Sequence, residues 1–539
     1  MHSPFAAHLG TNYCPKDEEL LKLNAFLVEP SYQLKRLRDE IAELHKTLHK
    51  LEEEHHSLLA HVDAHKALLS PVRRLPLDVI QEIFIACMPT HRNCVMSALE
   101  APVLLGRICR SWREISLSTP RLWSRLHIAE PQRDYGPYQP ILVPIQKLAQ
   151  RFENIKMWLG RSGECPLSIS LHSDPNNGLP LDLSSPPPFV QALLPFASRW
   201  QHIHFTTSPV TLDAISHLTE SDVPLLETVR FAHDHRLLAQ SVGLEQFGML
   251  RSPLISSFSA WENDFGRNLP LPWHRLTTLE MTGLTWECSI TSEKIVQILS
   301  QCPELRVCKL VVKDEGSVTG SSPLAVELKY LHTLRVTCQS VDLFITRLLD
   351  RLSLPKLQSF NLRGSSDGEH PPSLAPALAC WTELEDLEID SDGFSKLSLL
   401  ECLRGLPGTM QRLVIHDMTN SGLHNNALDD DAVTLLTPTS GHYLCPTLEI
   451  LEMTNCRWIS DATLLQFITL RMESRHKLKR IQINFNRDMT LDVRSALEPF
   501  MKNGLDISVS HNQPFPVYFS PWQGLSDAPG PTFSGRFGS

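Results

Sequence analysis

The chain contains 539 residues, with 50 lysines and arginines against 60 aspartates and glutamates, and therefore a formal charge of −10 at pH 7. This balance argues against a broadly basic nucleic-acid-binding protein, and a hydrophobic fraction of 42% excludes a wholly disordered chain. Proline (39) outnumbers glycine (24), so we expect short apolar segments separated by rigid connections.

Neither a membrane span nor a secretion signal is expected. The sequence has no apolar run of about 18 residues, and its first residues lack a basic segment followed by an apolar one. The 13 cysteines form no C-x-x-C pair, which favours reduced thiols over a disulfide framework. We therefore expect the protein in the cytoplasm, the nucleus or both.

Residues 1–30 show no regular period, and we interpret them as a leader. Residues 31–69 carry apolar side chains at alternating spacings of three and four, which predicts a coiled-coil-like helix. His55 and His65 fill two further positions of this seam. The seam either pairs with a second helix, including that of a second copy, or packs on the chain's own globular part. Its apolar members are Leu34, Leu37, Ile41, Leu44, Leu48, Leu51, Leu58, Val62 and Leu69.

A compact helical segment is expected at 72–126. It opens with LPLDVIQEIF at 75–84, continues with ICRSWREI at 108–115 and closes with PRLW at 120–123. A proline near the start of the first helix and an acidic residue in its first turn are typical helix N-terminal signals. The simplest interpretation is a three-helix bundle whose leucines and tryptophans form a core.

These three blocks, in this order, resemble the F-box, although the link CMPTHRNCVMSALEAP between the helices is longer than the family pattern. The resemblance implies docking on the Skp adaptor, which connects to a cullin scaffold and its RING subunit. Some matching residues must instead form the bundle core, and the sequence does not sort them. The matching residues are Leu75, Pro76, Leu77, Val79, Ile80, Ile83, Phe84, Leu105, Cys109, Trp112 and Trp123.

Residues 165–510 contain a recurring motif, apolar-x-x-apolar-x-apolar, with steps of 26, 26, 27 and 26 residues between Leu305 and Met410. Alternating apolar positions predict a short strand in each unit, and stacking is needed to bury its face. The unit CPTLEILEMTNCRWISDATLLQFI resembles the cysteine-containing leucine-rich repeat. We expect an irregular solenoid; a non-repetitive α/β domain is the alternative.

One residue of each motif, between its last two apolar positions, should point away from the core. In leucine-rich repeats, to which the motif is similar, these positions line the concave face and bind protein partners. The target-binding candidates are Glu280, Lys309, Arg335, Asn361, Glu388, Glu452 and Gln482, and His204, Arg230 and Val414 occupy the same motif position. Residues 127–164 are interpreted as a linker and residues 511–539, rich in proline, glycine and serine, as a flexible tail.

The sequence lacks the phosphate-binding, dinucleotide-binding, zinc-protease and serine-hydrolase motifs that would indicate an enzyme. No cofactor or metal site is expected. His45 and His49 are best read as part of a solvated helix face, and the aspartates at 429–431 lack the spacing of a calcium loop.

The sequence thus predicts an α/β protein with a coiled-coil-like helix, a small all-α F-box and a leucine-rich-repeat solenoid. The F-box resemblance implies a non-catalytic substrate adaptor of an SCF-type ubiquitin ligase. The alternative is an F-box scaffold that binds partners without promoting their degradation, in either case with self-association through residues 31–69. Neither a nucleic acid nor a membrane is an expected partner.

Overall fold

A computed structural model describes residues 3–69, 71–129, 145–172, 188–207, 212–232, 243–261, 268–282, 290–313, 325–341, 343–365, 371–417, 427–438 and 444–511. The chain divides into two compact units. We call Met1–Ala86 the N-terminal unit and Cys87–Ser539 the sheet unit. Each unit is described by itself.

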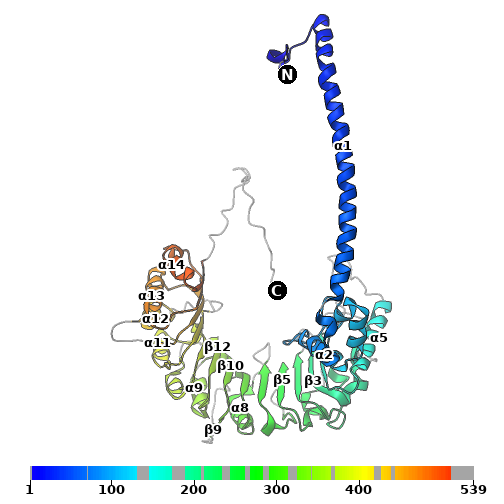
Figure 1. Ribbon diagram of the computed structural model, residues 1–539. Helices are drawn as coiled ribbons and strands as arrows, with labels where there is room; N and C mark the ends of the chain where they lie inside the picture. The colour runs from blue at the N-terminus through cyan, green and yellow to red at the C-terminus, as the bar shows by residue number, and fades with distance from the viewer. Residues whose placement is uncertain are drawn as a thin grey trace. The chain divides into compact units, whose positions relative to one another are not determined.

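The N-terminal unit is dominated by the helix α1 (Asp17–Leu68), whose 52 residues correspond to about 78 Å at 1.5 Å per residue. Acidic residues occupy its first turn and basic residues its last, which complements the helix dipole. Short 3-10 turns η1 (Ala6–His8) and η2 (Pro71–Arg74) flank it, and α2 (Leu77–Ala86) follows. In Figure 1, α1 is a continuous blue helix.

Two short helices, α3 (Leu105–Ile108) and α4 (Arg110–Leu117), open the sheet unit and contact each other. The turn η3 (Pro120–Trp123) follows and packs against α5 (Ile145–Arg161). Trp123 holds this corner together: its Nε1 donates to the Ser116 carbonyl at 2.7 Å, and its ring meets that of Trp158 edge to face at 4.8 Å.

A parallel sheet of 15 strands forms the body of this unit within the described residues, and its strand order follows the chain order. The strands are β1 (Arg125–Ala129), β2 (Leu167–His172), β3 (Trp200–Thr206), β4 (Thr228–Ala232), β5 (Ser257–Trp261), β6 (Thr278–Thr282), β7 (Ile290–Thr291), β8 (Val307–Lys313), β10 (Thr333–Ser340), β12 (Ser359–Ser365), β13 (Asp386–Asp390), β14 (Arg412–His416), β15 (Ile450–Cys456), β16 (Arg480–Phe485) and β17 (Asp506–Ser510). A separate two-stranded pair joins β9 (Val326–Glu327) to β11 (Leu352–Ser353).

Helices and 3-10 turns connect successive strands. Figure 1 shows the strands on the inner side of a curved layer and α8, α9 and α11 to α14 on its outer side. The connecting elements are α6 (Pro188–Leu193), η4 (Leu194–Arg199), η5 (Leu244–Gln246), η6 (Gly248–Arg251), η7 (Trp273–Arg275), α8 (Ser292–Leu299), α9 (Leu343–Asp350), α10 (Ala375–Cys380), η9 (Ser391–Gly393), α11 (Lys396–Arg404), α12 (Asp430–Leu436), α13 (Asp461–Glu473) and α14 (Val493–Lys502).

The core lies between the strands and these connecting elements. Alternate residues of each strand point into it, as the sequence motif predicted, and Leu334, Phe360, Leu387 and Leu413 occupy equivalent, fully buried positions on adjoining strands. Burying each such side chain contributes roughly 1.5–3 kcal/mol. The leucine-rich motif is therefore the source of the continuous apolar layer.

Three expected boundaries differ from the structure. The helix expected at 31–69 begins at Asp17, so that residues 17–30 of the expected leader belong to it, and the helix passes through Pro30. The linker expected at 127–164 contains the end of β1 and all of α5. The tail expected at 511–539 lies outside the described residues except for His511. Among the helices that the structure describes, none combines the length and apolar character that a bilayer crossing requires.

Candidate functional site

The apolar residues of the segment 75–84 divide into a buried pair and an exposed set. Ile80 and Phe84 are buried on one side of α2, whereas Leu77, Val79 and Ile83 are exposed, Leu77 by 55%. Leu75 is partly buried and Pro76 is exposed, with its carbonyl accepting the Ile80 N–H at 3.1 Å. Val79 and Ile83 lie one turn apart and form an exposed apolar pair, and Leu77 is exposed on another side of the helix. Exposed apolar side chains of this kind are suited to binding a protein partner.

The remaining F-box-matching residues, at 105–123, also divide into buried and exposed side chains. Leu105 and Trp123 are buried, Trp112 is half-buried and Cys109 is exposed. The Cys109 sulfur accepts the Trp112 N–H at 3.4 Å and so caps α4, which gives this thiol a structural task. Beside it, Ile108 is 55% exposed on α3.

The motif positions that were expected to point away from the core line up across the sheet. Glu280, Lys309, Arg335, Asn361 and Glu388 are direct Cα partners on successive strands from β6 to β13. The same row continues through Val414 and Glu452 to Gln482, and in the other direction it passes through Ser259 to Arg230 and His204. The structure therefore brings all seven target-binding candidates into one row, which we call the inner row.

Two members of the inner row are buried, whereas their motif position predicted side chains that a partner could contact. Asn361 is only 4% exposed, and neither its amide nitrogen nor its oxygen has a hydrogen-bond partner among the residues that the structure describes. Its neighbours in the row, Arg335 and Glu388, approach each other to 3.9 Å, so the two long side chains reach across the shorter amide. Val414 is buried as well. Position in the motif thus predicted the row but not which of its side chains remain accessible.

Glu388 is the centre of a charged cluster on β10 to β14. It receives His416 Nε2 at 3.2 Å and contacts the Arg363 guanidinium, with Arg335 farther away. The hydrogen bond to His416, followed by that to Arg363, keeps the pKa of Glu388 far below its usual range despite partial burial. His416 Nδ1 in turn lies 2.9 Å from Thr454 Oγ1. The carboxylate is therefore ionised and its position is fixed.

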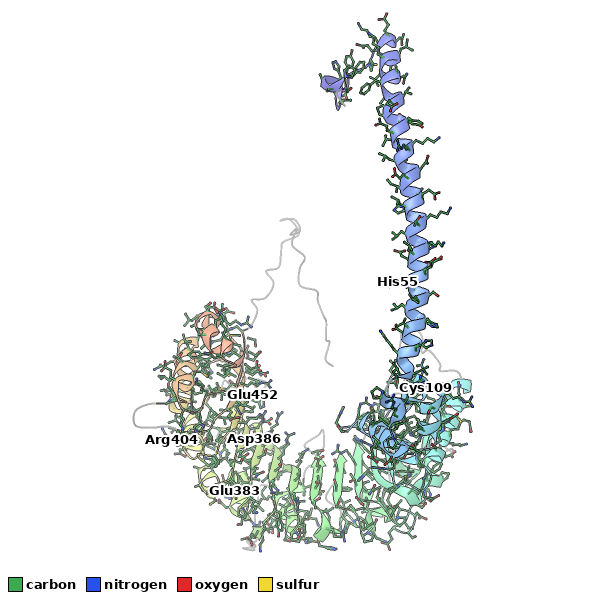
Figure 2. All side chains as sticks on the ribbon, viewed as in Figure 1. His55, Cys109, Glu383, Asp386, Arg404 and Glu452 are labelled. Carbon is green, nitrogen blue, oxygen red and sulfur yellow. The ribbon has the colours of Figure 1, made fainter. Side chains whose placement is uncertain are left out.

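Arg412 links two further carboxylates on the same side of the sheet. Its Nη1 donates to Asp386 at 3.0 Å and its Nη2 to Glu452 at 3.3 Å. Figure 2 labels Asp386 and Glu452 on the strand-lined inner side of the curved layer. Of these three residues the sequence analysis identified only Glu452, because Arg412 and Asp386 lie two positions before the inner row.

A second ion-pair group surrounds Glu280. Lys309 Nζ lies 2.6 Å from Glu280 Oε1, and Ser259 Oγ donates to Oε2 at 3.1 Å. Burial would raise the pKa of Glu280, but the contact with Lys309 outweighs it and the pKa is lowered. Of the two basic neighbours in the inner row, Lys309 is thus partly neutralised by Glu280, whereas Arg335 lies 3.9 Å from its nearest carboxylate, that of Glu388.

Acidic residues elsewhere do not assemble a metal centre. The expected acidic loop at 429–431 instead begins α12: Asp429 caps the helix by accepting the Asp431 N–H at 3.0 Å, and Lys396 lies 2.5 Å from both carboxylates. Burial raises the pKa of Asp390 and of Asp417 near the ends of β13 and β14. In the described part of the chain, no group of three or more histidines, cysteines or carboxylates is arranged to hold a metal ion.

No family model matches the sequence, and no curated protein shows significant similarity to it. The arrangement itself consists of exposed apolar side chains on α2 in the N-terminal unit and a polar inner row with fixed charges in the sheet unit. Both features are suited to recognition of other molecules.

Proposed function

We propose that this chain is a substrate-recognition adaptor of an SCF-type ubiquitin ligase. In this proposal the segment 72–126 is an F-box that docks on the Skp adaptor, and the repeats of the sheet unit form a leucine-rich-repeat solenoid that holds a target protein. The chain needs no catalytic side chain, because holding a target near a conjugating enzyme raises its local concentration. The compartment would be the cytoplasm, the nucleus or both.

One observation carries the proposal: the apolar residues of LPLDVIQEIF are not all used in folding. Ile80 and Phe84 are buried, which accounts for two of them, but Leu77, Val79 and Ile83 remain exposed on a helix of ten residues. A segment that only formed a bundle core would have no reason to keep three apolar side chains in water. The order of the three sequence blocks and the parallel repeat sheet add support.

The test is capture of the purified chain by a purified Skp adaptor. Leu77→Asp and Ile83→Asp place a charge in the expected interface and should each weaken capture at least about tenfold, as is typical of a central interface residue. Leu397→Asp is the matched control, since Leu397 is an exposed leucine on α11 of the sheet unit. Thermal unfolding checks that all three variants fold.

Equal capture of the three variants would refute the F-box assignment. If capture depends on Leu77 and Ile83, a reconstituted ubiquitination assay then separates an adaptor from a scaffold. Partners retained by the sheet unit should gain ubiquitin in the first case and remain unmodified in the second.

A further inference from the structure

The first four strands of the sheet unit border a pocket of about 540 Å³. This lies within the range of about 300–1,000 Å³ that is common for small-ligand sites. One wall comes from β1 to β4 and the other from residues 90–95, which belong to the link that exceeds the F-box pattern. We call it the histidine pocket. Its lining consists of Thr90, His91, Arg92, Asn93, Val95, Arg125, His127, Ser170, Leu171, His172, His204, Thr206 and Arg230.

The lining is basic and polar. It contains four histidines and three arginines, and none of the described lining residues is acidic. Four of these residues extend the inner row to β1: His127, Ser170 and His204 are direct Cα partners on β1, β2 and β3, and Arg230 follows on β4. Neighbouring strands lie about 4.8 Å apart, so His127 and His204 flank Ser170 at nearly equal distances.

Hydrogen bonds fix the floor of the pocket. Ser170 Oγ lies 2.9 Å from His127 Nδ1 and accepts from Asn93 Nδ2 at 3.2 Å. Asn93 Oδ1 accepts from Ser168 Oγ at 2.9 Å. His127 therefore uses its Nδ1 within the protein, and its Nε2 is the ring nitrogen left for a ligand.

The three arginines of the lining differ in how closely their guanidinium groups are already paired within the protein. Arg92 is paired with Glu100 at 2.5 Å, and Arg125 donates to the carbonyls of Pro89 and Arg92 and to Asn93. Arg230 Nη2, by contrast, lies 3.6 Å from Glu280, beyond hydrogen-bond distance, and the same carboxylate is held by Lys309 at 2.6 Å. Arg230 is thus the guanidinium best placed to pair with a bound anion.

The three strand histidines also influence one another. The pKa of His204 falls to about 4, mainly because the surrounding protein displaces water from the ring, and further because Arg230, His127 and His172 repel a second proton. The pKa of His127 is lowered for the same main reason, with His172 and Arg92 as the neighbouring charges. The rings of His127 and His204 are therefore neutral at pH 7 in the empty pocket, and a bound anion would favour their protonation.

We propose that the histidine pocket binds a phosphate monoester as its dianion, held by Arg230 and by the imidazoles of His127, His172 and His204. A dianion offers several acceptor oxygens to donors on different strands, and its charge attracts the Arg230 guanidinium and favours protonated imidazoles. The pocket volume leaves room for part of the molecule that carries the phosphate. A transition metal is the competing ligand of histidines, but the described side chains are not arranged to hold one.

This inference goes beyond the adaptor proposal and does not depend on it. The phosphate can come from a phosphorylated protein side chain or from a small phosphorylated molecule, and both sources present the same dianion. Binding should be accompanied by uptake of up to about one proton near neutral pH, because His204 is neutral before the anion arrives.

The experiment is calorimetric titration of the full chain with three probes: inorganic phosphate, a Gly-Ser peptide with one phosphoserine, and the same peptide without phosphate. Buffers of different ionisation enthalpy count the protons taken up. His204→Gln and Arg230→Gln should each weaken phosphopeptide binding at least about tenfold, as loss of a charge-assisted contact does. Arg335→Gln is the matched control: Arg335 and Arg230 occupy the same row, and both side chains are 46% exposed.

Binding that depends on the phosphate and on both pocket residues, but not on Arg335, supports the proposal. Phosphopeptide binding tighter than that of inorganic phosphate then indicates a phosphorylated chain as the source, and equal affinities indicate a small molecule. Absence of binding, an equal loss in Arg335→Gln, or stoichiometric binding of Zn²⁺ without any phosphate effect would overturn it.

Discussion

At the residue scale, the polar side chains with the largest structural roles lie inside the sheet unit. Asp461, the first residue of α13, has no exposed surface and receives Arg487 Nη2 at 2.7 Å, Thr490 Oγ1 at 2.7 Å and His511 Nε2 at 3.0 Å. Burial would raise its pKa, but these hydrogen bonds together lower it far below the usual range. Asp461 thus joins two later parts of the chain, the connection that contains Arg487 and Thr490 and the residue His511, to the start of α13.

We predict that Asp461→Asn lowers the free energy of unfolding by about 3 kcal/mol, because it leaves the Arg487 charge in a largely buried position without its partner. Asp506→Asn is the control: it removes an ion pair with Arg480 that is more than half exposed, and it should cost less than about 1 kcal/mol. Urea unfolding measures both. Similar losses in the two variants would contradict a special role for Asp461.

The pH dependence of stability has a defined sign for this residue. A carboxyl group with a lowered pKa in the folded state stabilises the fold above its unfolded pKa of about 3.9, and this contribution is lost as pH falls below that value. The difference in the free energy of unfolding between wild type and Asp461→Asn should therefore become smaller as the pH is lowered below about 3.9.

Some residue-scale features could not be predicted from the sequence. Arg471 is fully buried and donates to the carbonyls of Leu436, Leu444 and Cys445. In the sequence it is a polar residue in a helix, where exposure is the usual expectation. The histidine pocket was missed for a related reason: His127, His172 and His204 are far apart along the chain and become neighbours only when the strands pair in register.

At the element scale, α1 retains the seam that its heptads predicted. The apolar seam residues from Leu34 to Val62 are 39–65% exposed, and Figure 2 shows His55 on the same helix. The helix start at Asp17 was missed because residues 17–30 include Pro30 and lack the clear period of the following heptads. Periodicity therefore predicted the element and its seam but not its first turns.

We predict that two copies of the chain associate through this seam, because a long row of exposed leucines is stabilised by pairing. Light scattering of the full chain should give a dimer, and the double substitution Leu44→Asp and Leu48→Asp should give a monomer. Ala42→Asp with His49→Asp, which adds the same number of aspartates outside the seam, should remain a dimer. A monomeric wild-type chain would rule out self-pairing.

The period of the apolar motif correctly predicted the register of the central strands. From Lys309 to Val414 the register partners are 26, 26, 27 and 26 residues apart, which are the spacings of the apolar motif. β1 was not predicted as a strand, because its residues directly follow the PRLW block and were divided between the helical segment at 72–126 and the linker at 127–164. A single short strand carries too little periodic signal to be separated from a neighbouring motif.

At the scale of the whole sheet unit, neighbours in the sheet are neighbours in the chain. Contacts are therefore local in sequence. The stability of the sheet unit should then be approximately the sum of the stabilities of its strand-and-connection repeats and of the interfaces between neighbouring repeats. The repeats at the two ends of the sheet have one neighbouring repeat instead of two and should unfold first.

We predict a graded pattern of amide hydrogen exchange. Amides of β10 to β14 should exchange more slowly than those of β1 to β3 and of β16 to β17. Mass spectrometry of peptic fragments after a series of exchange times measures this difference. Uniform protection of every strand would show instead that the unit opens as a single cooperative block.

The edge of β1 has a consequence for synthesis of the chain. His127 donates its N–H to the Cys94 carbonyl at 2.7 Å and forms a parallel bridge with Val95, so residues that precede β1 cover part of its free edge. As the chain leaves the ribosome, this starting edge is covered before any later strand arrives, and each new strand adds to the opposite edge. The advancing edge then remains fully open to pairing with other nascent chains, whereas the starting edge is open only in part.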